Sequence, residues 1–150
     1  MTAPAVDPTA TTGTTDVEAL VRAFESCSLS RSEWDHRAHL TVALWYVAAH
    51  GHDGGLARIR AGILRLNAAL GVAQTPTSGY HETLTRFFTW VVWRFVSAAP
   101  PGATPAALVD ELIRRCGNRD LPLAYYSRER LMSWEARTGW VPPDLRPLDG

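Results

Sequence analysis

Apolar residues recur three or four positions apart over most of this chain, and this spacing constrains the fold more than any other feature. It places apolar side chains along one face of an α-helix, whereas a half-buried strand would show strict alternation, which the sequence lacks. The pattern therefore predicts an all-α fold, a single bundle of five to six helices. The expected helices cover residues 16–28, the stretch from a Ser32–Asp35 capping box to His50, residues 56–70, the stretch from Thr77 or Ser78 to a break at 98–103, residues 105–115 and, as one or two shorter helices, residues 121–137.

The length of 150 residues supports one substantial core, and three segments differ in composition. Residues 1–15 hold too few large apolar side chains to offset the entropy lost on ordering, so we expect a disordered tail. Residues 16–137 form the helical bundle, with a mobile polar turn at 50–55, where glycines interrupt the pattern. Residues 138–150 are rich in proline, and we expect an extended strap that packs Trp140 and Leu145 against the bundle.

Charge and composition exclude several classes of function. Fifteen arginines balance fifteen acidic residues, and this zero net charge argues against nucleic acid as a partner. The longest apolar run is too short to cross a membrane. The chain has no lysine, which excludes Schiff-base chemistry on this side chain, and its two cysteines form no C-x-x-C motif. A cytoplasmic location is the expectation, because no secretion signal is evident.

Two short stretches carry most of the candidate chemistry. WDHRAHL at residues 34–40 and GYHET at residues 79–83 place histidines at the starts of strongly apolar helices. On a helical wheel, His39 and Tyr46 fall within the apolar arc of their helix and His36 lies to its side, while His81 falls on the apolar face of its own helix. Buried polar groups need partners, so we predict that both stretches meet at one buried cluster.

This cluster is predicted to bind a small-molecule substrate. Three imidazoles suit a divalent transition metal, Zn, Fe or Cu, and otherwise no cofactor is expected. The predicted metal ligands are His36, His39 and His81, the predicted catalytic residues are Glu82, Tyr46 and Tyr80, with Glu82 as general base, and the predicted substrate-binding residues are Trp34 and Arg86.

Other interpretations of the same residues stay open. Each histidine also suits a structural role in the core, and Glu82 also suits an ion pair with Arg86 four residues on. The protein is thus predicted to be a metal-dependent enzyme, a cofactor-free acid/base lyase, isomerase or cyclase, or a non-catalytic binding module or partner subunit, with a homo-oligomer also open. The last class predicts an exposed apolar patch at Trp90, Trp93 and Trp140.

Four motifs resemble those of a group of small bacterial all-helical proteins of unassigned function. They are WxHxxHL from Trp34, GYHETxT from Gly79, YSRERL from Tyr126 and GWVxPDL from Gly139. The resemblance extends over nearly all of the chain from Arg31 onward. It implies a discrete helical module of bacterial origin and no particular reaction.

Overall fold

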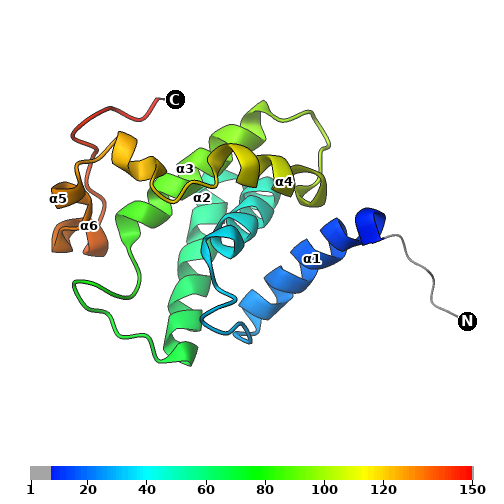
Figure 1. Ribbon diagram of the computed structural model, residues 1–150, viewed down its shortest axis with the longest axis horizontal. Helices are drawn as coiled ribbons and strands as arrows, with labels where there is room; N and C mark the ends of the chain where they lie inside the picture. The colour runs from blue at the N-terminus through cyan, green and yellow to red at the C-terminus, as the bar shows by residue number, and fades with distance from the viewer. Residues whose placement is uncertain (1–7, 150) are drawn as a thin grey trace, which may run out of the picture.

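The computed structural model describes residues 8–149 as a helical protein, with side chains described from residue 16 (Figure 1). Within this part of the chain there is no strand, and the one β-bridge joins Thr75 and Ser78. The prediction of an all-α fold with five to six helices is confirmed. The elements are α1 (Pro8–Glu25), α2 (His36–Leu70), α3 (Glu82–Ala98), α4 (Pro105–Cys116), the 3₁₀ helix η1 (Leu121–Ala124), α5 (Arg128–Leu131) and α6 (Trp134–Thr138).

Helix α1 begins at Pro8, so it takes in residues 8–15, which the sequence predicts to be disordered. Proline suits the first position of a helix, because its ring fixes a helical φ and because an N–H at that position would have no hydrogen-bond partner within the helix. The rest of the predicted tail, residues 1–7, lies outside the described residues. At its other end α1 stops at Glu25, three residues earlier than expected, and Cys27 follows with a positive φ of 58°.

Helix α2 consists of two arms that fold back on each other at Gly51. This glycine has φ 76° and ψ −172°, which no right-handed helix accommodates. A β-carbon on Gly55 would lie 3.0 Å from the Cα of Val47, so the arms touch just beyond the bend. The predicted six-residue turn at 50–55 is wrong, because one residue in the left-handed region suffices to reverse the chain and leaves residues 52–55 helical.

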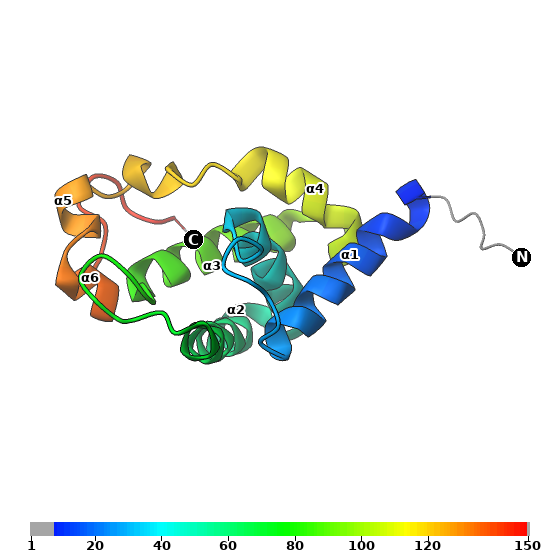
Figure 2. The same ribbon diagram turned by 60° about the horizontal axis from the view of Figure 1, so that its bottom comes forward.

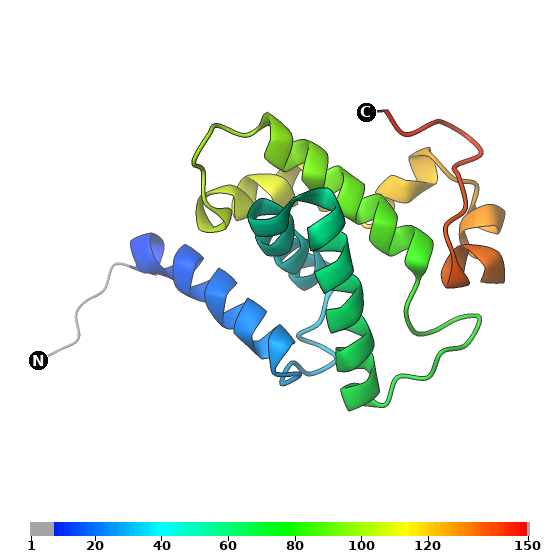
Figure 3. The same cartoon turned by 180° about the vertical axis from the view of Figure 1, so that it is seen from behind.

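The larger core lies between α1, both arms of α2, α3 and α4 (Figures 1 and 3). Phe24 of α1 is fully buried, and its ring would lie 2.3 Å from a β-carbon on Gly62 of the second arm. The side chain of Asp35 caps α2 by accepting a hydrogen bond from the Ala38 amide at 2.8 Å. Ser32 of the predicted capping box therefore lies outside the helix, and Asp35 alone serves as its N-cap.

A second, smaller core joins α3 to the C-terminal third of the chain. It contains Phe87, Val91, Tyr126 and Leu131, against which Trp140 and Leu148 pack. Helices α5 and α6 lie at the end of the molecule opposite to α1 (Figure 2).

The segment after α6 is non-helical and is tied to the bundle, as the sequence predicts for a strap. The Tyr126 hydroxyl donates to the Val141 carbonyl at 2.7 Å, and the Trp90 indole donates to the Asp149 carbonyl at 3.0 Å. Leu145 was expected to pack, and this is wrong, because its side chain is 60% exposed. The apolar anchors of the strap are Trp140, Val141 and Leu148 instead.

No helix in the described part of the chain combines the length and the apolar character that a membrane span requires.

Candidate functional site

A cavity of about 650 Å³ opens between the two predicted focal stretches. Its walls come from both arms of α2, the loop before α3, the first turns of α3, the loop after α4 and the region around α5 and α6. This volume is in the range of small-molecule sites in proteins. Of the predicted site residues, Trp34, His36, His39, Tyr80 and His81 line it.

His39 is held in one orientation and has one free ring nitrogen. Its Nδ1 donates to the Asp35 carbonyl at 2.7 Å, and its ring stacks on the indole of Trp34 with centroids 3.8 Å apart. Nε2 has no hydrogen-bond partner among the described residues and is not fully buried. Because the ring lines the cavity, this nitrogen is open to it. Burial lowers the pKa of His39 to about 4, which keeps the imidazole neutral near pH 7.

His36 faces the same cavity but differs in its surroundings. Its ring meets Phe88 of α3 edge-on with centroids 4.9 Å apart. Nε2 is buried and has no hydrogen-bond partner within the described residues. Burial first, and the nearby positive charge of Arg119 second, lower the pKa of His36. A buried nitrogen without a partner costs roughly 1–3 kcal/mol of stability, and a rotation of the side chain would relieve this cost.

His81 is the N-cap of α3, and both of its ring nitrogens are occupied. Nδ1 accepts a hydrogen bond from the Leu84 amide at 3.1 Å, and Nε2 donates to the Leu131 carbonyl at 2.8 Å. The predicted helix start at Thr77 or Ser78 is wrong, because both residues belong to a turn over 75–78 and the helix begins only after His81. Burial lowers the pKa of this imidazole, so the neutral ring acts as a cap and a tether to α5.

The described residues contain no group of three or more histidine, cysteine, aspartate or glutamate side chains placed to hold a metal ion. His36 and His39 share the cavity, but His81 has no lone pair left for a metal. The structure therefore does not bring His36, His39 and His81 together as one ligand set, and metal binding stays a prediction. Sequence reasoning missed this because the Leu131 carbonyl that occupies His81 comes from fifty residues further along the chain.

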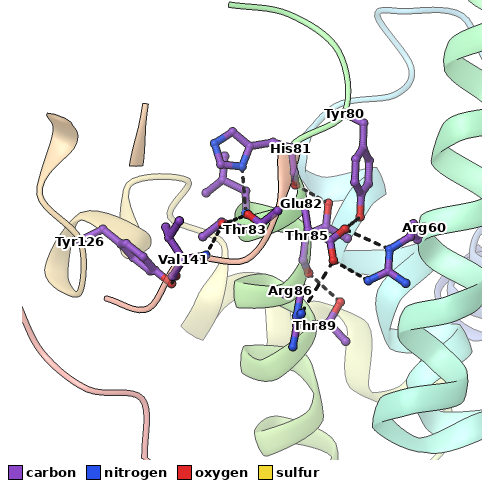
Figure 4. A network of polar contacts seen from close by, with 12 residues as sticks. Arg60, Tyr80, His81, Glu82, Thr83, Thr85, Arg86, Thr89, Tyr126 and Val141 are labelled. Carbon is purple, nitrogen blue, oxygen red and sulfur yellow. Dashed lines mark hydrogen bonds and ion pairs between the residues drawn. The ribbon is translucent and has the colours of Figure 1, made fainter. Parts of the chain in front are cut away.

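Glu82 is the centre of an ion-pair network and does not line the cavity (Figure 4). Arg60 of α2 donates to its Oε1 from Nε at 3.0 Å and to its Oε2 from Nη2, and the Tyr80 hydroxyl donates to Oε1 at 2.6 Å. These donors hold the pKa of Glu82 low in spite of its burial, which acts in the opposite direction. In this arrangement the carboxylate of Glu82 holds α3 to α2, and its role as a general base stays a prediction.

Two further predicted site residues also lie away from the cavity. The Tyr46 hydroxyl donates to the Glu25 carboxylate of α1, and burial together with this contact raises its pKa. Arg86 lies over the Trp140 ring at 4.9 Å and 4.0 Å from Glu82. Both side chains join helices or the strap to the bundle, and the roles of Tyr46 as a catalytic residue and of Arg86 as a substrate clamp stay predictions.

Trp34 and Tyr80 are placed as predicted, in the cavity wall. Trp34 stacks between His39 and Phe24, so one edge of the site is continuous with the main core. The Tyr80 hydroxyl is bonded to Glu82, and burial first and this hydrogen bond second raise its pKa to about 12. Tyr80 therefore connects the cavity wall to the ion-pair network.

The GYHET stretch is largely structural. Gly79 has φ 91°, and a β-carbon there would meet the Ala73 carbonyl at 2.9 Å. Thr83 is fully buried; its hydroxyl donates to the Gly139 carbonyl and accepts from the Val141 amide, which fastens the strap to α3. His81, Glu82 and Thr83 thus each have a partner distant in sequence, and the motif predicted the place of the cavity better than its chemistry.

Three arginines of the cavity wall were not predicted. Arg31 precedes α2, Arg119 lies in the loop after α4 and Arg137 lies in α6. Each comes from a different part of the chain with no local motif around it, so only tertiary packing brings them to one cavity. No signal in the sequence distinguishes them from the other twelve arginines.

Comparison with known proteins returned nothing for this chain: no protein-family model matches it, and there is no significant match to a curated protein or a solved structure. The resemblance to small bacterial helical proteins stays a prediction.

Proposed function

We propose that this protein is a small enzyme that binds a metabolite in the cavity and uses His39 to accept a proton from it. The observation that carries the proposal is the free Nε2 of His39, which faces a cavity of about 650 Å³ while Nδ1 is fixed on the Asp35 carbonyl. A neutral imidazole with one nitrogen oriented and the other open is the arrangement that general-base catalysis needs.

The surroundings of His39 support a proton-transfer reaction. The Trp34 ring restrains the imidazole from one side, and the hydrogen bond to Asp35 selects the tautomer with a lone pair on Nε2. Removal of a proton from a bound carbon or hydroxyl begins an elimination, an isomerisation or a cyclisation, and none of these needs a redox cofactor. We assign the protein to this group of reactions.

A role as a partner subunit has less support. That role predicts an apolar patch at Trp90, Trp93 and Trp140, yet all three are partly buried against the two cores. Among the side chains that the structure describes, the large apolar ones that are exposed are Leu64, Met132, Trp134 and Leu145. Met132 lines the cavity, and the other three come from α2, α6 and the strap.

The test does not require knowledge of the substrate. The protein is incubated with a bacterial metabolite extract in D₂O, and mass spectrometry follows which compounds gain deuterium or change in amount. We expect such a compound with the wild-type protein and with His50→Gln, a control at an exposed histidine, but not with His39→Gln. If no compound changes, or if His39→Gln is as active as the wild type, the proposal is wrong.

Dependence on a metal stays a prediction that the same assay tests. Treatment with a chelator, together with element analysis of protein purified without an affinity tag, shows whether a transition metal takes part. Since His81 is fully occupied, any such metal would have at most two imidazole ligands from the predicted set, His36 and His39.

A further inference from the structure

Three guanidinium groups line the cavity without a carboxylate partner. Arg31, Arg119 and Arg137 form no ion pair with any described residue, whereas Arg37, Arg60, Arg86, Arg114 and Arg115 each have an acidic partner within 4.0 Å. Arginine at a protein surface is often merely solvated. Three unpaired ones around a single cavity indicate a ligand that carries negative charge.

Arg137 carries the strongest part of this argument. Its Nη1 donates to the Gly79 carbonyl at 2.9 Å, which fixes the side chain at the cavity, and its Nε is buried without a partner among the described residues. Burial lowers the pKa of this guanidinium, and no nearby carboxylate opposes that effect. Nη2 has no hydrogen-bond partner among the described residues either, but it is not fully buried, so an acceptor in the cavity can reach this nitrogen and stabilise the partly desolvated cation.

The other two arginines differ in exposure and in their contacts. Arg119 is exposed, has no polar partner in the described chain and is close enough to His36 and His39 to lower the pKa of both. Arg31 donates to the Leu70 carbonyl at 3.0 Å, so it is anchored without being neutralised. A ligand beside His39 therefore lies within the electrostatic reach of Arg119.

The charge of the wall favours a ligand with one negative charge. Two carboxylates, Asp35 and Asp120, also line the cavity, so three arginines leave a formal excess of one positive charge when the histidines are neutral. The rest of the wall is largely apolar or aromatic, with Trp34, Leu40, Ile63, Leu84 and Phe88 among its residues. A carboxylate on an apolar body matches both features, whereas a phosphate ester brings close to two negative charges.

We propose that the ligand of this cavity is a small monocarboxylate with an aromatic or other apolar body, whose carboxylate is bound by Arg137 and Arg119. The body lies against Trp34 and Phe88, which places it beside the open nitrogen of His39. The inference rests on the proposed function in taking this cavity as the ligand site, but it makes a separate claim about charge.

Binding of defined probes tests this claim by calorimetry. The probes are benzoate, 3-phenylpropionate and indole-3-acetate, with benzyl alcohol, benzylamine and phenyl phosphate as neutral, cationic and dianionic comparisons. We expect at least one carboxylate to bind about tenfold or more tightly than each comparison compound. Nitrogen-15 spectra of the histidine rings should shift for His36 and His39 and stay unchanged for the exposed His50.

Arginine variants then assign the contact. Arg119→Gln and Arg137→Gln should each weaken carboxylate binding about tenfold, while Arg128→Gln, at an exposed arginine away from the cavity, should leave the affinity within about twofold. Arg119 has no structural contact, so its variant reports on binding even if Arg137→Gln unfolds.

Several results would overturn the inference: no carboxylate binds, benzyl alcohol or benzylamine binds equally well, phenyl phosphate binds more tightly, or Arg119→Gln has no effect. Carboxylate binding without any His39-dependent deuterium exchange would overturn the proposed function and keep this inference. Deuterium exchange into a neutral or cationic metabolite would overturn this inference and keep the proposed function.

Discussion

His39 should make the protein less stable in acid, and the size of this effect follows from its burial. Burial holds its pKa at about 4 in the folded protein, below the ordinary value of 6.5 that the unfolded chain restores. The Asp35 carbonyl and carboxylate oppose this shift, while His36 and Arg119 add to it. The folded state therefore binds a proton only at a lower pH than the unfolded state does.

The sign and magnitude follow from this difference. Above pH 6.5 the ring is neutral in both states, and its contribution to stability is complete. As the pH falls toward 4, the unfolded chain gains a proton that the folded protein excludes, and the free energy of unfolding drops by about 3 kcal/mol.

Urea titrations followed by tryptophan fluorescence at several pH values measure this loss, since the chain has six tryptophans. We expect His39→Gln, which cannot titrate, to lack about 3 kcal/mol of the stability loss that the wild type shows between about pH 7 and about pH 4. His36 and His81, whose pKa values are also lowered, keep their own contributions in both proteins. His50→Gln is the matched control and should retain the wild-type slope. An unchanged pH slope in His39→Gln would refute the assignment of a buried, neutral imidazole.

Three other variants test the packing around the site, two of them by the same unfolding assay and one by hydrogen exchange. Glu82→Gln should lower the free energy of unfolding by about 1–3 kcal/mol, because it weakens the pairing with Arg60. The variant should keep the deuterium exchange into the substrate. Loss of this exchange in the folded variant would show that the carboxylate takes part in the chemistry. Gly62→Ala should cost about 1–3 kcal/mol, because its β-carbon would lie 2.3 Å from the Phe24 ring; full stability would mean that α1 and α2 are not in close contact there. Thr83→Val should speed hydrogen exchange at the Val141 amide, which loses its acceptor; unaltered protection would exclude this anchor for the strap.

Features that depend on near neighbours in sequence were predictable. Helix α4 starts at Pro105, as the sequence predicts, and the Thr104 side chain caps it; such a start needs only the backbone amides of the next turn. The all-α class was also predictable, because apolar periodicity depends on residues only three or four positions apart. The place of the cavity was also predictable, since His36, His39 and His81, from the two stretches that the sequence singles out, line it.

The chain reversal in α2 shows the limit of such reasoning. The glycines at 51, 54 and 55 predict a broken helix, but not that Gly51 alone makes the bend and that Gly55 is small because Val47 packs against it. Which glycine bends the chain and which one allows close packing depends on the contact between the two arms, and a contact requires both partners to be in place.

The chemical role of each polar residue was decided by the tertiary structure alone. His81 is occupied by the Leu131 carbonyl and Glu82 by Arg60, whereas His39 has one nitrogen free. From the sequence these groups are equivalent candidates, because a side chain is available for chemistry only when folding leaves it without a partner. The sequence by itself determined the helices, their faces and the neighbourhood of the site; the fold decided which groups are free to act, because hydrogen-bond partners tens of residues away occupy the others.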